Sequence, residues 1–226
     1  DYSANTNLEI QVSRNSGILS ILLPKFIKDK INPLIGERNL AEDQGEVCIL
    51  FCDIMDFDKV IQTEGKRVAQ ILDDIFRTFD QFCASHGIQK IETVGKTYMA
   101  CAGLKSVEMS LSKNIQSINP IRRILDLALD MEEFIKRTTY GDGIPMKIRI
   151  GIHYGKVIAG VIGFHKPQFS LIGDTVNTTS RVCTANNPGQ IRMSEVAYKK
   201  MMALGGPGRS EIYFIAKVEY VRAISL

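Results

Sequence analysis

Little in this sequence points to nucleic acid or to a membrane. The net charge is only +3 over 226 residues, too small an excess to indicate binding to a phosphate backbone or to an anionic lipid surface. No apolar run approaches the roughly 20 residues that a membrane-spanning helix needs. No aromatic ribonucleoprotein motif is present either, so we set aside an RNA-binding platform. We predict no nucleic-acid partner and no direct membrane contact from this stretch of chain.

Metal-binding and disulfide motifs are also missing. The five cysteines are odd in number, scattered, and include no C-x-x-C pair, which argues against a zinc site and a disulfide framework. The three histidines show no spacing typical of a metal site. We expect reduced thiols, mostly in apolar strands and helices. The residues concerned are Cys48, Cys52, Cys83, Cys101 and Cys183.

One short stretch of the sequence matches only part of a phosphate-binding loop motif. Gly95, Lys96 and Thr97 match the last positions of G-x-x-x-x-G-K-[ST], in which backbone N–H groups cradle the phosphates. The first glycine of that motif would fall at Lys90. The following segment, TYMACAGL, is rich in β-formers and predicts a strand where the motif requires a helix. The Gly-Lys pair therefore indicates a tight hairpin.

The rest of the composition is that of an ordinary globular domain. Apolar residues make up 45% of the chain and charged residues 23%, and the length suffices for a substantial core. We predict a linker and an amphipathic helix over residues 1–45 and one domain over residues 46–226. The sequence begins with Asp1 rather than Met, so we expect a fragment of a longer protein.

The periodicity of the apolar residues predicts alternating strands and helices. An apolar run over 46–53 indicates a buried strand, and a helical stripe follows over 65–85, ended by Gly87. The later elements are a hairpin over 88–94 and 97–104, a polar surface insertion over 105–118, a helix over 120–137, strands over 146–153 and 156–163, and a helix with Asp174 as its N-cap. The order β-α-β-β-α-β predicts an α+β ferredoxin-like sandwich, with helices on one face of an antiparallel sheet and a C-terminal α/β extension.

Asp53 is the first candidate for chemistry because it ends the buried run EVCILFCD. A carboxylate in that place is costly unless it binds a cation or a hydrogen-bond donor. Carboxylate oxygens suit magnesium, which proteins hold with one or two carboxylates together with substrate phosphates. The alternative is that Asp53 caps the following turn. A calcium loop is excluded, because the glycine and the closing glutamate that it needs are absent.

Glycines and a polar helix mark a second region. Four glycines at positions 151, 155, 160 and 163, in a predicted strand-turn-strand, indicate close backbone approach to another chain or to a ligand. Asn177 and Arg181 are four residues apart on the predicted helix and so lie on one face. An arginine beside a neutral donor suits a phosphoryl oxygen, although such a pair is also common on a solvated helix face.

Four motifs, in this order and at these spacings, resemble the catalytic domain of class III nucleotidyl cyclases. They are FCDIMDF, KIETVGKTYMACAGL, RIGIHYGKVIAGVIG and IGDTVNTTSR, and the similarity runs from about Glu46 to the C-terminus. The resemblance implies head-to-tail dimers with active sites at the interface, where two aspartates of one subunit hold two Mg²⁺ or Mn²⁺ ions on the triphosphate. It also implies attack of the ribose 3′-hydroxyl on the α-phosphorus, yielding a 3′,5′-cyclic nucleotide and pyrophosphate.

The resemblance assigns roles to individual residues. Asp53 matches the first metal aspartate, and the Ile54 carbonyl is expected to join it. Asn177 and Arg181 match the pair that contacts the ribose and the transition state. Lys217 falls near the lysine that binds the phosphates, although the KGKG run usual there is absent.

Two further positions of the resemblance predict the base. Adenylyl cyclases resembling this chain place Lys and Asp there, and guanylyl cyclases place Glu and a small residue; this chain has Glu92 and Ser170. A Glu carboxylate accepts from guanine N1–H and N2–H, and a Ser hydroxyl donates to O6. We therefore expect GTP as substrate, with an adenylyl cyclase making cyclic AMP as one alternative and Glu92 as a merely exposed strand residue as another.

Lys96 stands where the family has its second metal aspartate. A lysine cannot coordinate magnesium and repels a cation, and in a homodimer both sites would lack this ligand. The substitution resembles the second, base-reading cyclase domain of membrane adenylyl cyclases. We expect a second cyclase domain that supplies the metal aspartates, and a cytoplasmic location within a larger membrane-anchored protein. The competing hypothesis is a catalytically degenerate domain that binds nucleotide or only dimerises.

Overall fold

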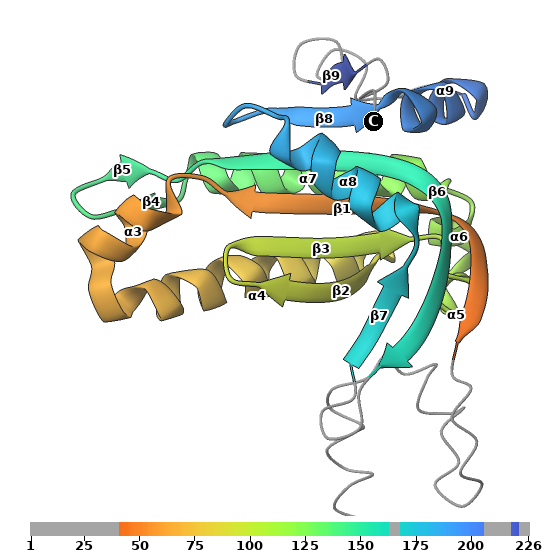
Figure 1. Cartoon of the computed structure of the whole chain (residues 1–226), viewed down its shortest axis with the longest axis horizontal. Coiled ribbons are helices and arrows are strands. Elements are labelled where there is room, and N and C mark those ends of the chain that lie inside the picture. Colours follow the sequence, from red (N-terminus) through yellow and green to blue (C-terminus); the bar gives the residue numbers. More distant parts are fainter. Residues whose placement is uncertain (1–40, 163–167, 206–217, 222–226) are drawn as a thin grey trace, which may run out of the picture.

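A long strand, β1 (Glu42–Ile54), runs through the middle of the main sheet, between an antiparallel neighbour on each side (Figure 1). The computed structural model describes residues 41–162, 168–205 and 218–221. The sheet order is β2-β3-β1-β6-β8-β9, and β7 pairs with the far part of β6. The strands that accompany β1 are β2 (Gln89–Val94), β3 (Thr97–Ala102), β6 (Ile148–Ile162), β7 (Gln168–Ile172), β8 (Ile191–Ser194) and β9 (Val218–Val221), and a separate small sheet holds β4 (Thr139–Tyr140) and β5 (Ile144–Pro145).

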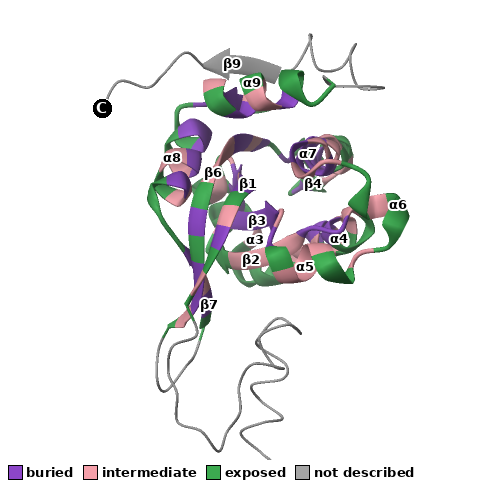
Figure 2. Cartoon of the chain, turned by 90° about the vertical axis from the view of Figure 1, so that its right-hand side faces the viewer, coloured by how far each residue is buried: buried purple, intermediate pink, exposed green. Residues whose placement is uncertain are grey.

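Helices lie on both faces of this sheet, but unequally. Two long helices, α4 (Val68–His86) and α7 (Pro120–Lys136), cover one face, while α8 (Asp174–Thr184) lies on the other (Figures 1 and 2). The remaining helices are α3 (Phe57–Glu64), the 3-10 turn η1 (Gly65–Arg67), α5 (Lys105–Ser110), α6 (Lys113–Gln116) and α9 (Glu195–Ala203). The face that carries α8 is therefore the less covered one.

Alternation along β1 divides the interior into two cores, because successive strand residues point to opposite faces. Cys48, Leu50 and Cys52 belong to the larger core beneath α4 and α7. Val47 and Ile49 belong to the smaller core on the other face. The near-continuous apolar run of this strand is thus explained by burial on both faces.

The predicted β-α-β-β-α-β order and the ferredoxin-like sandwich are confirmed by β1, α4, β2, β3, α7 and β6, with β8, α9 and β9 as the C-terminal extension. Gly87 ends α4 in the left-handed conformation, with φ of 64°. Pro120 stands in the first turn of α7, where the Asn119 side chain accepts hydrogen bonds from two backbone N–H groups. The first strand begins at Glu42, within the segment 1–45 that was predicted as linker and helix, and the predicted helix itself lies outside the described residues.

Two local predictions are wrong. The strands predicted over 146–153 and 156–163 are one strand, β6, of 15 residues, and Gly155 lies inside it. The glycines there make room for α8: a Cβ at Gly151 would lie 2.3 Å from the backbone nitrogen of Cys183, and one at Gly155 would lie 2.5 Å from Thr175 Oγ1. Their close approach is thus to a helix of the same chain.

The second correction concerns the start of α8. Asp174 is its first residue, and the N-cap position belongs to Gly173, whose φ is 147°. That backbone conformation favours glycine, and a Cβ would also lie 3.2 Å from the Lys156 carbonyl oxygen. Asp174 still contributes a negative charge in the first turn, where it complements the helix dipole.

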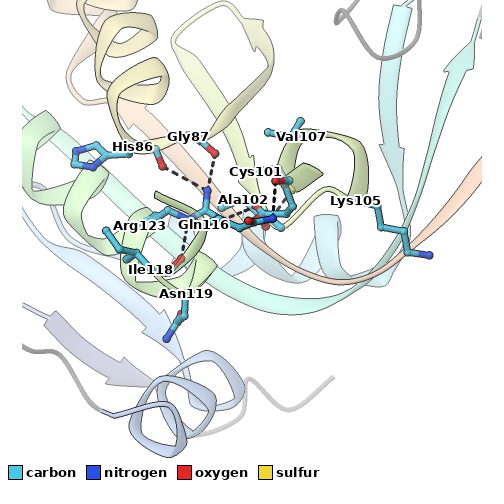
Figure 3. A network of polar contacts seen from close by, with 12 residues as sticks. His86, Gly87, Cys101, Ala102, Lys105, Val107, Gln116, Ile118, Asn119 and Arg123 are labelled. Carbon is cyan, nitrogen blue, oxygen red and sulfur yellow. Dashed lines mark hydrogen bonds and ion pairs between the residues drawn. The ribbon is translucent and has the colours of Figure 1, made fainter. Parts of the chain in front are cut away.

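The polar segment 105–118, predicted as a surface insertion, forms the short helices α5 and α6 and is tied to the core by one buried arginine (Figure 3). Arg123, 1% exposed, donates to the carbonyl oxygens of Gly87 at 2.7 Å and of Ile118 at 3.1 Å, and its Nη2 lies 2.5 Å from Glu108 Oε1. Three strong acceptors thus compensate the buried charge.

All five cysteines are buried in strands and helices, as predicted. Along 41–162, 168–205 and 218–221, no helix combines the length and the apolar character needed to cross a membrane.

Candidate active site

Three neighbouring strands bring the predicted metal aspartate together with a threonine and an arginine. Asp53 of β1 stands directly opposite Thr97 of β3 on one side and Arg149 of β6 on the other. Because paired residues of adjacent strands share a face, the three side chains form a row across the face that carries α8. They line a cleft of about 430 Å³, together with Lys96 in the hairpin turn and Glu92 further along β2.

The Asp53 carboxylate is fully engaged within the chain. Thr97 Oγ1 donates to Oδ1 at 2.6 Å, and Arg149 donates to Oδ2 from Nη2 at 2.8 Å and from Nε at 3.1 Å. Asp53 is only 6% exposed, so these donors offset the cost of burying its charge. The alternative that Asp53 caps the following turn does not apply, since the donors to its carboxylate are the side chains of Thr97 and Arg149.

Arg149 is a site residue that the sequence interpretation missed. It lies in the apolar run MKIRIGIH, where Ile148, Ile150 and Ile152 point into the larger core and Arg149 points to the opposite face. The sequence signal for this residue was a charged side chain between apolar neighbours in a predicted buried strand. The register that sets it against Asp53, 96 residues away, could not be read from the sequence.

Lys96 also lies in the cleft, half-buried in the turn between β2 and β3. Its carbonyl accepts a hydrogen bond from the Ile54 backbone N–H at 3.0 Å. Its ammonium group has no hydrogen bond or ion pair with any described residue. A positive charge therefore occupies the place where the resemblance puts a second carboxylate.

The predicted base-reading residues lie on neighbouring elements. Glu92 of β2 lines the cleft, and its Oε2 accepts a hydrogen bond from Gln168 Nε2 of β7 at 3.1 Å. Ser170 is two residues further along β7, opposite Gly160, and so points to the same face as Gln168. The structure brings the β7 strand that carries Ser170 into contact with Glu92.

Asn177 and Arg181 lie apart from Asp53. Both are exposed on α8, one turn apart, and neither side chain has a hydrogen bond or ion pair to a described residue. The face of α8 that lines the cleft instead carries Ser180, Cys183 and Thr184. The two predicted catalytic side chains thus point outward, and the predicted phosphate ligand, Lys217, lies outside the described residues.

The thiol of Cys183 closes one side of the cleft. Burial, together with the nearby Asp53 carboxylate, raises the pKa of this thiol to about 12. At neutral pH the group is therefore protonated in the metal-free chain. Its Sγ donates weakly to the Arg149 carbonyl, at 3.6 Å.

The groups of this cleft do not suit a divalent cation in their present arrangement. Both oxygens of Asp53 already accept hydrogen bonds, and Lys96 adds an uncompensated positive charge. Over the part of the chain that the structure describes, no three His, Cys, Asp or Glu side chains gather in a way that could hold a metal ion. Metal binding by Asp53 and the Ile54 carbonyl stays a prediction.

Comparison with known proteins settles the family. The model of the adenylate and guanylate cyclase catalytic domain matches residues 40–217, which is most of the chain. The chain belongs to this family. The class III cyclase fold is also that of the guanylate cyclase domain of RhGC from Catenaria anguillulae in complex with GTP, at a TM-score of 0.62 and 30% identity over 71% of this chain and 84% of that one.

Curated relatives of this cyclase domain include enzymes named for either nucleotide. The germination-specific adenylate cyclase of Dictyostelium discoideum is 35% identical over 81% of this chain. The receptor-type guanylate cyclase gcy-6 of Caenorhabditis elegans is 31% identical over 84% of it. The chain spans 21% and 17% of the length of these two proteins. Domains of this class generally use divalent metal ions and act as dimers.

Proposed function

We propose that this cyclase domain converts GTP to 3′,5′-cyclic GMP and pyrophosphate as the base-reading half of a head-to-tail heterodimer. A partner cyclase domain would supply the carboxylates that hold the two Mg²⁺ or Mn²⁺ ions. The observation that carries the proposal is Lys96 in the cleft, beside an Asp53 whose oxygens are engaged by Thr97 and Arg149. A site that needs metal must then obtain its metal ligands from elsewhere.

The choice of GTP rests on Glu92 and Ser170. The Glu92 carboxylate lines the cleft and already binds an N–H donor, the amide of Gln168, so it can accept N–H groups of guanine in the same way. Adenine presents an acceptor at N1 where guanine presents a donor, so ATP would place a lone pair against this carboxylate. A hydrogen-bond mismatch of this kind discriminates strongly between substrates.

The exposed face of α8 supplies groups for the reaction. Arg181 and Asn177 have no partner among the described residues, so they are free to contact a nucleotide held against another domain. The Arg181 guanidinium would stabilise negative charge that develops on the α-phosphoryl oxygens, and Asn177 would orient the ribose. Lys217 would bind phosphate oxygens. The metal ions, when bound by the partner, supply activation of the 3′-hydroxyl.

The paired parts of β6 and β7, Ile158–Ile162 and Gln168–Ile172, offer a surface for the partner. Ile158, Ile162 and Ile172 point to the same face of these two strands and are 46%, 53% and 46% exposed. Large apolar side chains gathered in this way favour association with another protein surface. The same face carries Ser170, which connects the proposed interface with base recognition.

The test is to assay the purified chain with GTP and with ATP in Mn²⁺ or Mg²⁺, alone and mixed with a cyclase domain that has both metal aspartates. We expect cyclic GMP only from the mixture, and a loss of about a hundredfold or more in kcat when the chain carries Arg181→Ala. The matched control is Arg77→Ala, an exposed arginine on α4 that should leave the rate unchanged. Robust cyclic GMP production by the chain alone would contradict the proposal.

A second candidate is a degenerate cyclase domain that regulates a partner without contributing to chemistry. Lys96 and the engaged Asp53 favour it. It predicts that Arg181→Ala in the complex leaves activity intact, opposite to the expectation above. We also propose a cytoplasmic position in a longer membrane-anchored protein, which the receptor-type relative supports.

A further inference from the structure

The first strand of the main sheet, β1, contains a β-bulge close to its start. The register of β1 with β6 shifts between Asp43 and Gly45, so Gln44 is an extra residue, and Gly45 has a φ of 70°. A glycine in this left-handed region is typical of a bulge. Because a bulge bends its strand and increases the local twist, it changes the direction in which the pairing continues.

The bulge lies where β6 and β7 leave the main sheet. The two residues of β1 before the bulge pair with Ile158 and Ala159 of β6, which are also the first residues of β6 that pair with β7. The two strands then run away from the rest of the sheet (Figures 1 and 2). We call their paired parts, Ile158–Ile162 and Gln168–Ile172, the β6–β7 arm. The conformation of the bulge therefore affects the direction of the arm, which carries Ser170.

The start of α5 binds this bulge. Gln44 is only 4% exposed, and its Oε1 accepts a hydrogen bond from the Lys105 backbone N–H at 3.0 Å, while its Nε2 donates to the Glu42 carbonyl at 3.4 Å. The Lys105 ammonium donates to the Asp43 carbonyl at 2.7 Å. Lys105 is the first residue of α5, so its N–H has no acceptor within the helix. One hydrogen bond thus satisfies both a buried side chain and a helix-terminal N–H.

The helix α5 is itself fixed to the core and so provides a firm support for the bulge. Glu108 of this helix forms the ion pair with the buried Arg123. Leu111 and Ile115, which follow α5, pack so closely on Gly87 that a Cβ at this glycine would lie 2.7 Å from a side-chain atom of each. The contact between Gln44 and Lys105 therefore connects the base of the β6–β7 arm to the rigid part of the domain.

We propose that Gln44 is a positioning residue: through its hydrogen bond with Lys105 it fixes the bulge and hence the direction of the β6–β7 arm that presents Ser170 to the base. The inference rests on the proposed function, which gives Ser170 its role. Arg181 lies on α8, which packs on Gly151 and Gly155, in the part of β6 before the arm. Loss of the hydrogen bond should therefore weaken nucleotide binding more than it slows the chemical step.

Double electron–electron resonance between two spin labels measures the position of the arm without any need for activity. One label is attached at Gln81→Cys on α4 and the other at Ile162→Cys at the end of the arm. Both positions are exposed, whereas the five native cysteines are buried. The distribution of label-to-label distances then reports the direction of the arm relative to the main body of the domain.

Two substitutions break the hydrogen bond from opposite sides. Gln44→Met removes the acceptor and keeps an unbranched side chain of similar length. Lys105→Pro removes the N–H, and proline suits the first position of a helix. Leu104, with φ of −66° and ψ of 125°, already has the conformation that a residue before proline adopts. Lys105→Ala is the matched control, because it removes the same side chain but keeps the N–H.

We expect Gln44→Met and Lys105→Pro each to shift or broaden the distance distribution. The double variant should resemble either single variant, since all three lack the same bond. In the complex with a partner domain, and without labels, both changes should raise KM for GTP by about three- to tenfold while kcat stays within about twofold. Thermal unfolding of each variant verifies the fold.

The proposal is overturned if both variants keep the wild-type distance distribution, or if Lys105→Ala alters it as much as Lys105→Pro does. A fall in kcat at unchanged KM would also contradict it, because the arm would then not act through nucleotide binding. A mixture that forms no cyclic GMP would refute the proposed function, whereas the distances would still test the role of Gln44. The two proposals can therefore fail separately.

Discussion

At the scale of single residues, hydrogen bonds hold the buried Asp53 carboxylate in place. Asp53 ends a strand that is buried on both faces, and it is held by Thr97 and Arg149. These hydrogen bonds account for the burial of the Asp53 charge without a bound cation. The ion pair with Arg149 joins β1 to β6 at the floor of the cleft.

We propose that Glu92 and Ser170 decide the base preference, so that it can be reversed at these two side chains. The double change Glu92→Lys with Ser170→Asp presents a donor and an acceptor in the sense that adenine requires. We expect the ratio of kcat/KM for GTP over ATP to fall by about tenfold or more, measured in the complex with a partner domain. Each single change should lower kcat/KM for GTP without raising kcat/KM for ATP. An unaltered ratio would mean that the base lies elsewhere.

His153 gives the folded state a dependence on pH. Burial lowers the pKa of this imidazole below its ordinary value of 6.5, although the Asp174 carboxylate acts in the opposite direction, and Nδ1 lies 2.6 Å from Ser194 Oγ. Below about pH 6.5 the unfolded chain binds a proton that the folded chain does not, so the free energy of unfolding falls as pH falls.

The slope for this single group is at most about 1.4 kcal/mol per pH unit. The free energy of unfolding of the wild type relative to His153→Gln, measured with urea, should therefore fall between pH 7 and pH 5, since the variant lacks the titrating group. Above pH 7.5 the two stability curves should run parallel. A rise in the relative stability of the wild type on acidification would contradict the assigned direction of the shift.

At the scale of elements, α8 owes its position to glycines in β6. Gly151→Ala would place a methyl group 2.3 Å from the backbone nitrogen of Cys183. Either the helix moves or the strand does, and overpacking of this kind costs about 1 to 3 kcal/mol. We expect a lower urea midpoint and a lower kcat in the complex, because α8 carries Arg181. Lys156→Ala, exposed in the same strand, should change stability by no more than about 0.5 kcal/mol.

The same elements show what the sequence could and could not predict. Local signals sufficed for α4 and α7, where apolar stripes, Gly87 and Pro120 mark the helices. The glycines of β6 were misread as a turn, because a glycine that admits a helix looks the same in sequence as one that turns a chain. Arg149 was missed because its partner is set by strand register, a property of tertiary structure.

At the scale of the whole molecule, the prediction is a division of labour between two chains. Lys96→Asp restores the carboxylate that the family carries after the hairpin glycine. A chain with Lys96→Asp and Arg181→Ala would supply metal ligands but lack the α8 arginine, while the wild type would have the reverse. Neither should produce cyclic GMP alone, and a mixture of the two should do so in Mn²⁺.

The control for this complementation is a mixture in which both chains carry Arg181→Ala, which should remain inactive. Activity is read as cyclic GMP formed per minute against the ratio of the two chains, with a maximum near equal amounts if the active species is a dimer. A flat, background-level response with both proteins folded would show that Lys96 is not what prevents the chain from acting alone.

The burial of Arg123 limits how the chain can be rearranged. Segment 105–118 is polar and connects two regular elements, which makes it an obvious place for a circular permutation or an inserted reporter domain. A new terminus there would separate Glu108 from Arg123 and leave a guanidinium that is 1% exposed without its carboxylate. The loop between β4 and β5, where Gly143 has open space around it, is the better choice for such engineering.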